Sequence, residues 1–157
     1  MAAIRLVDAA PASADAAYCL ERYFEELGAR FDGGFDPRLS EAPTLDEFAP
    51  PGGVFVLAYL KRRPVGCGGF KRRTKDTAYL KRMWVDSGER GRGLGRTLLD
   101  ELEQRAFRLG YRKVCLDTHR SLAEAQHLYR SGGYVEVAPF NAERYADHWF
   151  EKTLAPR

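Results

Sequence analysis

A run of arginines and glycines is the feature of this sequence with the clearest chemistry: Arg90-Gly91-Arg92-Gly93-Leu94-Gly95. It follows a stretch of strand-forming residues that ends at Val85 and precedes a run with helical spacing from about Thr97. In that setting several backbone N–H groups and the positive end of a helix dipole point toward one place. The glycines let the backbone approach a ligand closely, and the arginines, with Arg96 just beyond, add positive charge. The loop therefore predicts a binding site for an anion such as a pyrophosphate.

Two other glycine-rich phosphate motifs do not match this loop. The pattern G-x-x-x-x-G-K-[ST] fails because the frame that ends at Gly95-Arg96-Thr97 begins at Arg90 and has arginine in place of lysine. The dinucleotide pattern G-x-G-x-x-G fails because the loop reads G-x-G-x-G, although Asp117 lies near the distance expected of its acidic residue. We interpret Asp117 as a residue at the end of a strand. A flexible turn without a ligand is the remaining alternative.

The elements that must position the loop are indicated by hydrophobic periodicity and turn residues. We expect strands over residues 4–7, 54–60, 65–71, 77–85, 113–118, 134–137 and 148–154. We expect helices from Ser13 or Asp15 to Gly28, from about Thr97 to Leu109, and from a capping box at residues 121–124 to Ser131. Hairpins join the strands that precede the loop, so the first half of the sheet should be antiparallel.

Length, composition and charge restrict the class of protein. The chain has 157 residues, enough for one domain, and its 45% hydrophobic and 30% charged residues are those of a globular protein. No apolar run approaches the roughly 20 residues of a membrane span, and no signal peptide is recognisable, so we expect a cytoplasmic protein without a membrane partner. The three cysteines and three histidines are too dispersed to predict disulfides or a metal. Basic clusters at residues 61–63, 71–73 and 90–96 keep a nucleic-acid-binding domain as an alternative, but no reader motif accompanies them and we expect no nucleic acid.

The loop and its surroundings resemble one family. The loop matches [QR]-x-x-G-x-[GA], the acyl-CoA loop of the GNAT superfamily of N-acetyltransferases. Other segments are similar to the fourth strand, the following helix, the fifth strand and the C-terminal part of that family: Lys81-Arg82-Met83-Trp84-Val85, Leu98-Leu99, Leu116-Asp117-Thr118, Ala125, Leu128-Tyr129 and Gly132-Gly133-Tyr134. The resemblance covers about residues 54–154. It implies an α/β (α+β) GNAT fold over residues 1–157, with a mixed sheet of about six to seven strands and about four helices.

The resemblance also implies a donor site for acetyl-CoA or another short acyl-CoA, with no metal. In the family, backbone groups at the positions of Met83 and Val85 bond the pantetheine arm, and the loop holds the pyrophosphate. The residues expected at the cofactor are Met83, Trp84, Val85, Arg90, Gly91, Arg92, Gly93, Leu94, Gly95, Arg96, Thr97 and His119.

The expected chemistry is direct transfer of an acetyl group to an amine of a small molecule or peptide. Tyr129 aligns with the tyrosine that in many GNAT enzymes donates a proton to the departing thiolate. Its alternative role is that of a core aromatic residue. The general base is left open, because Tyr79 stands where many relatives carry glutamate. Candidate residues of the acceptor site are Tyr23, Glu26, Phe31, Phe35 and Tyr79.

One functional alternative and the oligomeric state stay open at this point. A GNAT-fold module that binds acyl-CoA as a sensor without catalysis would explain the missing glutamate. A homodimer is an open option, since the sequence does not define the oligomeric state.

Overall fold

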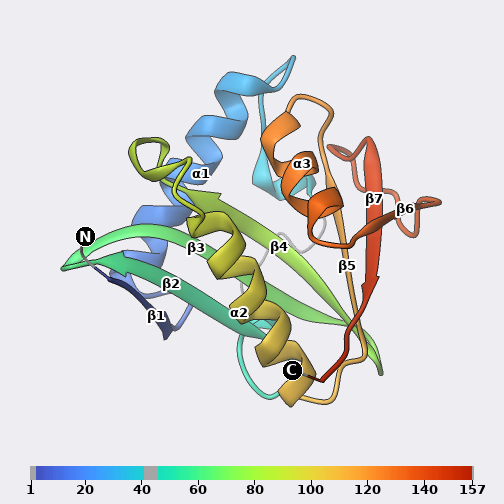
Figure 1. Ribbon diagram of the computed structural model, residues 1–157. Helices are drawn as coiled ribbons and strands as arrows, with labels where there is room; N and C mark the ends of the chain where they lie inside the picture. Colours follow the sequence, from blue (N-terminus) through green and yellow to red (C-terminus); the bar gives the residue numbers. More distant parts are fainter. Residues whose placement is uncertain (1–2, 41–45, 157) are drawn as a thin grey trace.

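The computed structural model describes residues 3–40 and 46–156 of the chain. Figure 1 shows the elements in chain order. The strands are β1 (Ile4–Asp8), β2 (Val54–Leu60), β3 (Arg63–Thr74), β4 (Thr77–Val85), β5 (Lys113–Thr118), β6 (Val135–Val137) and β7 (His148–Thr153). The α-helices are α1 (Ala14–Arg30), α2 (Leu94–Arg108) and α3 (Ala123–Ser131). Short 3-10 helices are η1 (Pro37–Leu39), η2 (Asp46–Phe48) and η3 (Ser87–Glu89).

The described strands form one seven-stranded sheet in the order β1-β2-β3-β4-β5-β7-β6. All neighbouring strands are antiparallel except β4 and β5, which are parallel. The predicted mixed sheet with an antiparallel first half is therefore confirmed. The parallel pair is short, because only Thr77–Tyr79 of β4 face Lys113–Cys115 of β5. Beyond these residues the two strands diverge and open a split in the sheet.

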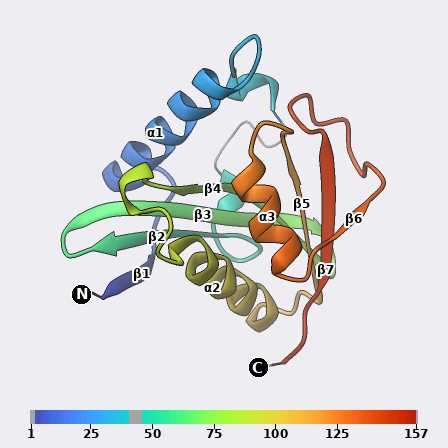
Figure 2. The same cartoon turned by 45° about the horizontal axis from the view of Figure 1, so that its top comes forward.

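The helices cover both faces of the sheet. α1 lies over one face, and α2 lies over the other, as Figure 2 shows. The side chains of Leu98, Leu99 and Leu102 recur at helical spacing on α2 and are fully buried in one core cluster. Cys19 and Leu20 of α1 pack in a separate cluster that includes Trp84 of β4. The helix on each face of the sheet therefore packs in its own hydrophobic core.

The helices differ from the predicted ones in number and in their ends. About four were expected, and the described residues contain three α-helices. α1 continues past Gly28 to Arg30, since Leu27 is buried and Arg30 pairs with Glu26 one turn earlier. α2 begins at Leu94 instead of about Thr97, directly after the loop.

The predicted capping box at the start of α3 is wrong. The N-cap is Leu122, and no side chain among the described residues caps it. The hydroxyl of Ser121 bonds instead to Nδ1 of His119, and Glu124 pairs with Arg30 of α1. The two side chains of the box therefore join α3 to its neighbours.

Membrane-spanning helices and metal-binding clusters are both absent from the described part of the chain. Across residues 3–40 and 46–156, no helix combines the length and the apolar composition that a membrane span requires. Within the same ranges, no three His, Cys, Asp or Glu side chains are grouped as a metal site would need.

Candidate functional site

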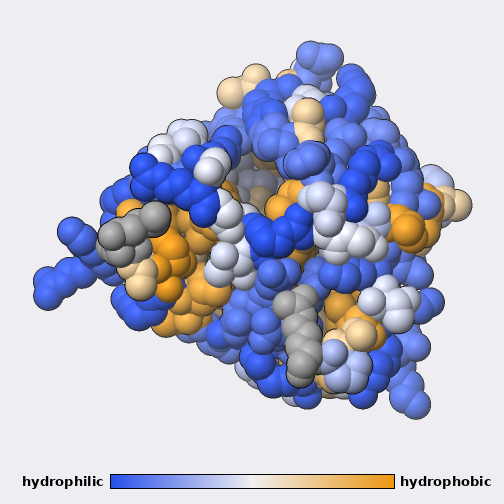
Figure 3. All heavy atoms as spheres, in the orientation of Figure 1, coloured by the Kyte–Doolittle hydropathy of each residue, from blue (hydrophilic) through white to orange (hydrophobic). Residues whose placement is uncertain are grey.

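A cleft of about 430 Å³ opens beside the glycine-rich loop. Its walls come from the end of β4, the loop with the start of α2, and the facing sides of α1 and α3. Figure 3 shows that this face of the molecule is mostly hydrophilic and is hollowed between α1 and α3. Most of the residues predicted at the cofactor line the cleft: Met83, Trp84, Val85, Arg90, Gly91, Gly93, Leu94, Gly95 and Arg96.

The loop has the backbone geometry of an anion site. Gly91 and Gly93 take left-handed conformations, with φ of 82° and 79°, which residues with a side chain adopt only at a cost. Gly93 is the N-cap of α2, and no side chain in the described ranges caps that helix. The N–H groups of the first turn of α2 are therefore available to a negatively charged ligand at the cleft.

The arginines of the loop already have protein partners. Arg90 donates from Nε to the carbonyl oxygen of Val85 at 2.9 Å and from Nη2 to Oε1 of Glu26 at 2.6 Å. Arg92 pairs with Glu89 at 3.2 Å, and Arg96 donates to Oγ of Ser131 at 2.6 Å. A bound pyrophosphate would compete with these acceptors for the guanidinium groups.

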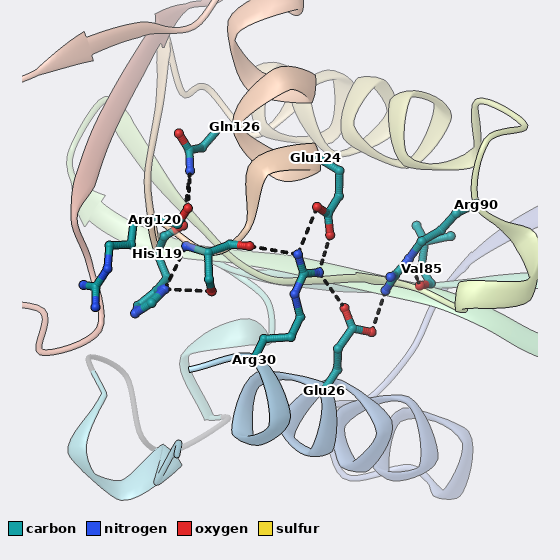
Figure 4. Close-up of polar contacts among 9 residues, drawn as sticks. Glu26, Arg30, Val85, Arg90, His119, Arg120, Glu124 and Gln126 are labelled. Atoms are coloured by element: carbon teal, nitrogen blue, oxygen red, sulfur yellow. Dashed lines mark hydrogen bonds and ion pairs between the residues drawn. The ribbon is translucent and has the colours of Figure 1, made fainter. Parts of the chain in front are cut away.

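An ionic bridge joins the two helices beside the cleft. Arg30 of α1 donates to both carboxylate oxygens of Glu124 on α3 and to the carbonyl oxygen of Ser121 at 2.8 Å. Figure 4 shows Arg30 between Glu124 and Glu26, with Arg90 turned toward Glu26 and Val85. The hydrogen bond from Arg30 lowers the pKa of Glu124 to about 2. The bridge therefore holds α3 against α1 while Glu124 is ionised.

A second cavity of about 80 Å³ adjoins the cleft. Phe31, Phe35 and Tyr145 form an aromatic wall, and Phe31 stacks on His119 with ring centroids 3.9 Å apart. Polar side chains also line this cavity: Lys81, Arg82, Asp117, Glu143 and Ser40. The residues common to both spaces are Tyr23, Leu27, Met83, Leu122, Ala125 and Tyr129. The two spaces therefore meet between α1, the end of β4 and α3.

Tyr129 lies at this junction. It is 6% exposed and packs edge-on against Tyr134, with ring centroids 5.8 Å apart. Burial raises the pKa of Tyr129 well above its ordinary value, so the phenol is protonated at neutral pH. It could therefore donate a proton, and it also packs as a core aromatic residue.

Four of the predicted site residues do not line the space in which they were expected. His119 lines the smaller cavity and not the cofactor cleft, and burial lowers its pKa. Arg92 and Thr97 belong to the loop and α2 but do not line the cleft. Tyr79 is 1% exposed and lines neither space.

The acceptor candidates divide between the two spaces. Phe31 and Phe35 line the smaller cavity alone, and Tyr23 borders both. Glu26 lines the larger cleft alone, where it pairs with Arg30 and Arg90. The structure thus places Glu26 on the donor side.

Two notable residues were missed by sequence reasoning. Arg82 is 2% exposed and has φ of 64° at a bulge in the β3–β4 pairing, where its guanidinium lies 5.0 Å from the ring of Phe24. A strand pattern gives no signal for a left-handed arginine. Asp117 follows the apolar residues Val114–Leu116, and a lone carboxylate in such a strand is a usable signal for a functional site.

The mixed sheet, its split and the glycine-rich start of α2 define an α/β fold with a candidate anion site beside a divided sheet. Residues 20–134 match the model of the Acetyltransferase (GNAT) family. Because this match covers more than half of the chain, the protein belongs to that family, and the predicted family and fold are confirmed.

Curated relatives carry acetyltransferase names. The chain is 33% identical over 97 residues to an IAA acetyltransferase of Azospirillum brasilense, covering 61% of this chain and 63% of the relative. It is 29% identical over 129 residues to an uncharacterized N-acetyltransferase of Schizosaccharomyces pombe, covering 77% of this chain and 75% of the relative. The first match thus spans less than two thirds of that relative.

Solved structures show the same fold at low sequence identity. A GNAT-family acetyltransferase of Staphylococcus aureus superposes with a TM-score of 0.81 at 22% identity, over 98% of this chain and all of that chain. A PaiA N-acetyltransferase of Thermoplasma acidophilum, in complex with coenzyme A, superposes with a TM-score of 0.76 at 18% identity, over 97% of this chain and 99% of that chain.

Proposed function

We propose that this protein transfers an acetyl group from acetyl-CoA, or another short acyl group from its CoA thioester, to an amine of a small molecule or peptide. The observation that carries the proposal is the junction of the two spaces: a cleft at an anion-binding loop meets a second cavity at Tyr129. Transfer requires such a junction, because the thioester and the amine must enter from different sides and meet at reacting distance.

The residues of the larger cleft fit a CoA donor. The left-handed glycines and the uncapped start of α2 suit the pyrophosphate. Apolar side chains of Leu94, Ala125 and Leu128 along the cleft suit the methylene groups of a pantetheine arm. β4 beyond Tyr79 is not paired with β5, so backbone groups of Met83 are in position to bond that arm. A coenzyme A complex of a structural relative, the PaiA N-acetyltransferase, adds support.

The reaction needs one acid and one base. The amine nitrogen attacks the thioester carbon, the C–N bond forms, the C–S bond breaks and CoA leaves as a thiolate. In this proposal the hydroxyl of Tyr129 gives its proton to the thiolate, which its raised pKa permits at neutral pH. The aromatic wall of Phe31, Phe35 and Tyr145 favours an acceptor with an apolar body.

We further propose that residues 1–157 act as one N-acetyltransferase domain in the cytoplasm. The single sheet that runs through the described residues supports the domain assignment. CoA and an amine are the expected partners.

The test is a thiol-release assay with the purified protein and acetyl-CoA against amino acids, polyamines, arylamines and peptides. We expect release of free CoA with at least one class, above the rate without amine. Tight binding of acetyl-CoA in calorimetry without release for any class would contradict the proposal and favour a sensor.

A further inference from the structure

The smaller cavity is lined by the carboxylate of Asp117. Asp117 lies near the end of β5, beyond the three residues through which β5 pairs with β4. Its side chain borders the smaller cavity at the split in the sheet. Alternation along β5 places Asp117 on the same face as Cys115 and opposite Leu116, which packs in the core under α2.

A chain of hydrogen bonds fixes the orientation of this carboxylate. The hydroxyl of Tyr79 donates a hydrogen bond to Oδ2 of Asp117. Asn141 donates from Nδ2 to the same hydroxyl at 3.0 Å, and its Oδ1 accepts from Nε1 of Trp149 at 2.9 Å. Tyr79, the residue that stands in place of a strand glutamate, therefore holds a carboxylate supplied by the next strand.

The surroundings of Asp117 favour its acceptance of a proton. Burial raises the pKa of Asp117, while Lys81 and the hydrogen bond from Tyr79 act in the opposite direction and Glu143 adds to the rise. The other charged or titratable side chains that line the cavity are those of Tyr23, Arg82, His119, Tyr129 and Tyr145. A buried carboxylate loses its desolvation cost when it is protonated, so it is a stronger base than an exposed one.

Other groups at the cavity are less suited to take a proton. Glu143 accepts a hydrogen bond from Oγ of Ser40 at 2.8 Å and lies 3.7 Å from Nζ of Lys81. Nδ1 of His119 accepts the backbone N–H of Ser121 at 3.0 Å, which assigns the proton of the neutral imidazole to Nε2. With its lone pair in use, that neutral ring is a poor proton acceptor.

We propose that Asp117 is the general base that deprotonates the acceptor amine. The inference rests on the proposed acetyl transfer. As the amine nitrogen attacks the thioester carbon, the proton of the amine passes to the carboxylate of Asp117. Tyr129, which lies on α3, protonates the departing CoA thiolate. The base thus comes from β5 and the acid from α3, and the two border the same small cavity.

The test compares Asp117→Asn with the wild-type protein and with Glu151→Gln. Glu151 lies on β7 opposite Cys115 and pairs with Lys113, so it is a carboxylate of the same sheet outside the cavity.

For Asp117→Asn we expect kcat at about pH 7 to fall by ~10²- to 10⁴-fold, the usual contribution of a general base. The Kd for CoA should not change. The defect should shrink toward about pH 10, because more of the acceptor amine is then already neutral. Glu151→Gln should match the wild type.

The outcomes separate the two proposals. If the wild type releases no thiol with any amine, acetyl transfer itself fails and the role of Asp117 falls with it. If the wild type is active and Asp117→Asn keeps its kcat at every pH, only the role of Asp117 is overturned. A defect that is the same at every pH would also overturn it, since a structural role predicts that result.

If Asp117→Asn does not bind CoA, the wild-type pH profile decides. With saturating substrates, kcat should rise with pH through an apparent pKa above that of an ordinary aspartate. A kcat that stays constant from about pH 4 to about pH 9 would overturn the proposal.

Discussion

The two spaces that meet at Tyr129 differ in how the chain builds them. Much of the larger cleft comes from one continuous stretch, from Met83 to Arg96, which ends one strand and begins one helix. The smaller cavity takes residues from α1, β4, β5 and the segment around Glu143 and Tyr145. In the proposed function, donor recognition therefore depends largely on residues that are neighbours in the sequence. Acceptor recognition depends on residues that only the tertiary structure brings together.

Loss of Tyr129, the proposed acid at the junction of the two spaces, should have the largest effect on kcat. It should separate the chemical step from donor binding. Tyr129→Phe removes one hydroxyl and keeps the ring that packs on Tyr134 and Phe150. We expect kcat to fall by ~10²- to 10⁴-fold with an unchanged Kd for CoA, measured by thiol release and calorimetry. A variant as fast as the wild type would reduce Tyr129 to a packing residue.

A change in the loop should act on the donor side alone. Gly93→Ala places a side chain at φ of 79°, where about 1–2 kcal/mol of strain favours a rearranged loop that CoA must restore. We expect CoA affinity to fall by about 5- to 30-fold in calorimetry.

Gly110→Ala is the matched control, because Gly110 has φ of 99° just after α2, outside the cleft. It should lower the melting temperature without a change in CoA affinity. Equal CoA affinities for Gly93→Ala and the wild type would exclude the predicted role of the loop.

Replacement of Glu26, the partner of Arg90, should have a smaller effect on CoA affinity. Glu26→Gln removes a negative charge from the donor cleft and releases Arg90 for the pyrophosphate. We expect CoA to bind up to about 5-fold more tightly at low salt, with less difference at high salt. Glu25→Gln is the control, since Glu25 is exposed and pairs with Arg22 instead. Weaker CoA binding by Glu26→Gln would show that the ion pair assists the donor site.

The smallest expected effect is a change in melting temperature when the Arg30–Glu124 bridge between α1 and α3 is removed. Folding lowers the pKa of Glu124 from 4.5 to about 2, so the bridge stabilises the folded state above about pH 4.5 and loses this effect as the pH falls toward 2. Because Glu124 is more than half exposed, the melting temperatures of the wild type and Glu124→Gln should differ by less than about 4 °C at neutral pH. That difference should vanish near pH 2. A difference that grows as the pH falls would contradict the lowered pKa.

The sequence was informative where structure depends on neighbouring residues. The loop, α2 and the strands on either side of it were predicted, because glycine spacing and hydrophobic periodicity are local signals. Asp117 was interpreted as a strand-end residue because its environment depends on where β5 stops pairing with β4. The ion pairs of Glu124 and Arg90 could not be predicted, since their partners on α1 are 94 and 64 residues away in the chain.

The central claim is direct acetyl transfer at the junction of the two spaces. Its most direct test measures free CoA thiol and acetylated amine in the same reaction, the amine by mass spectrometry. We predict one acetylated amine for every thiol released, at a rate that depends on Tyr129. Thiol release without an acetylated product would indicate hydrolysis of the thioester and would contradict the account.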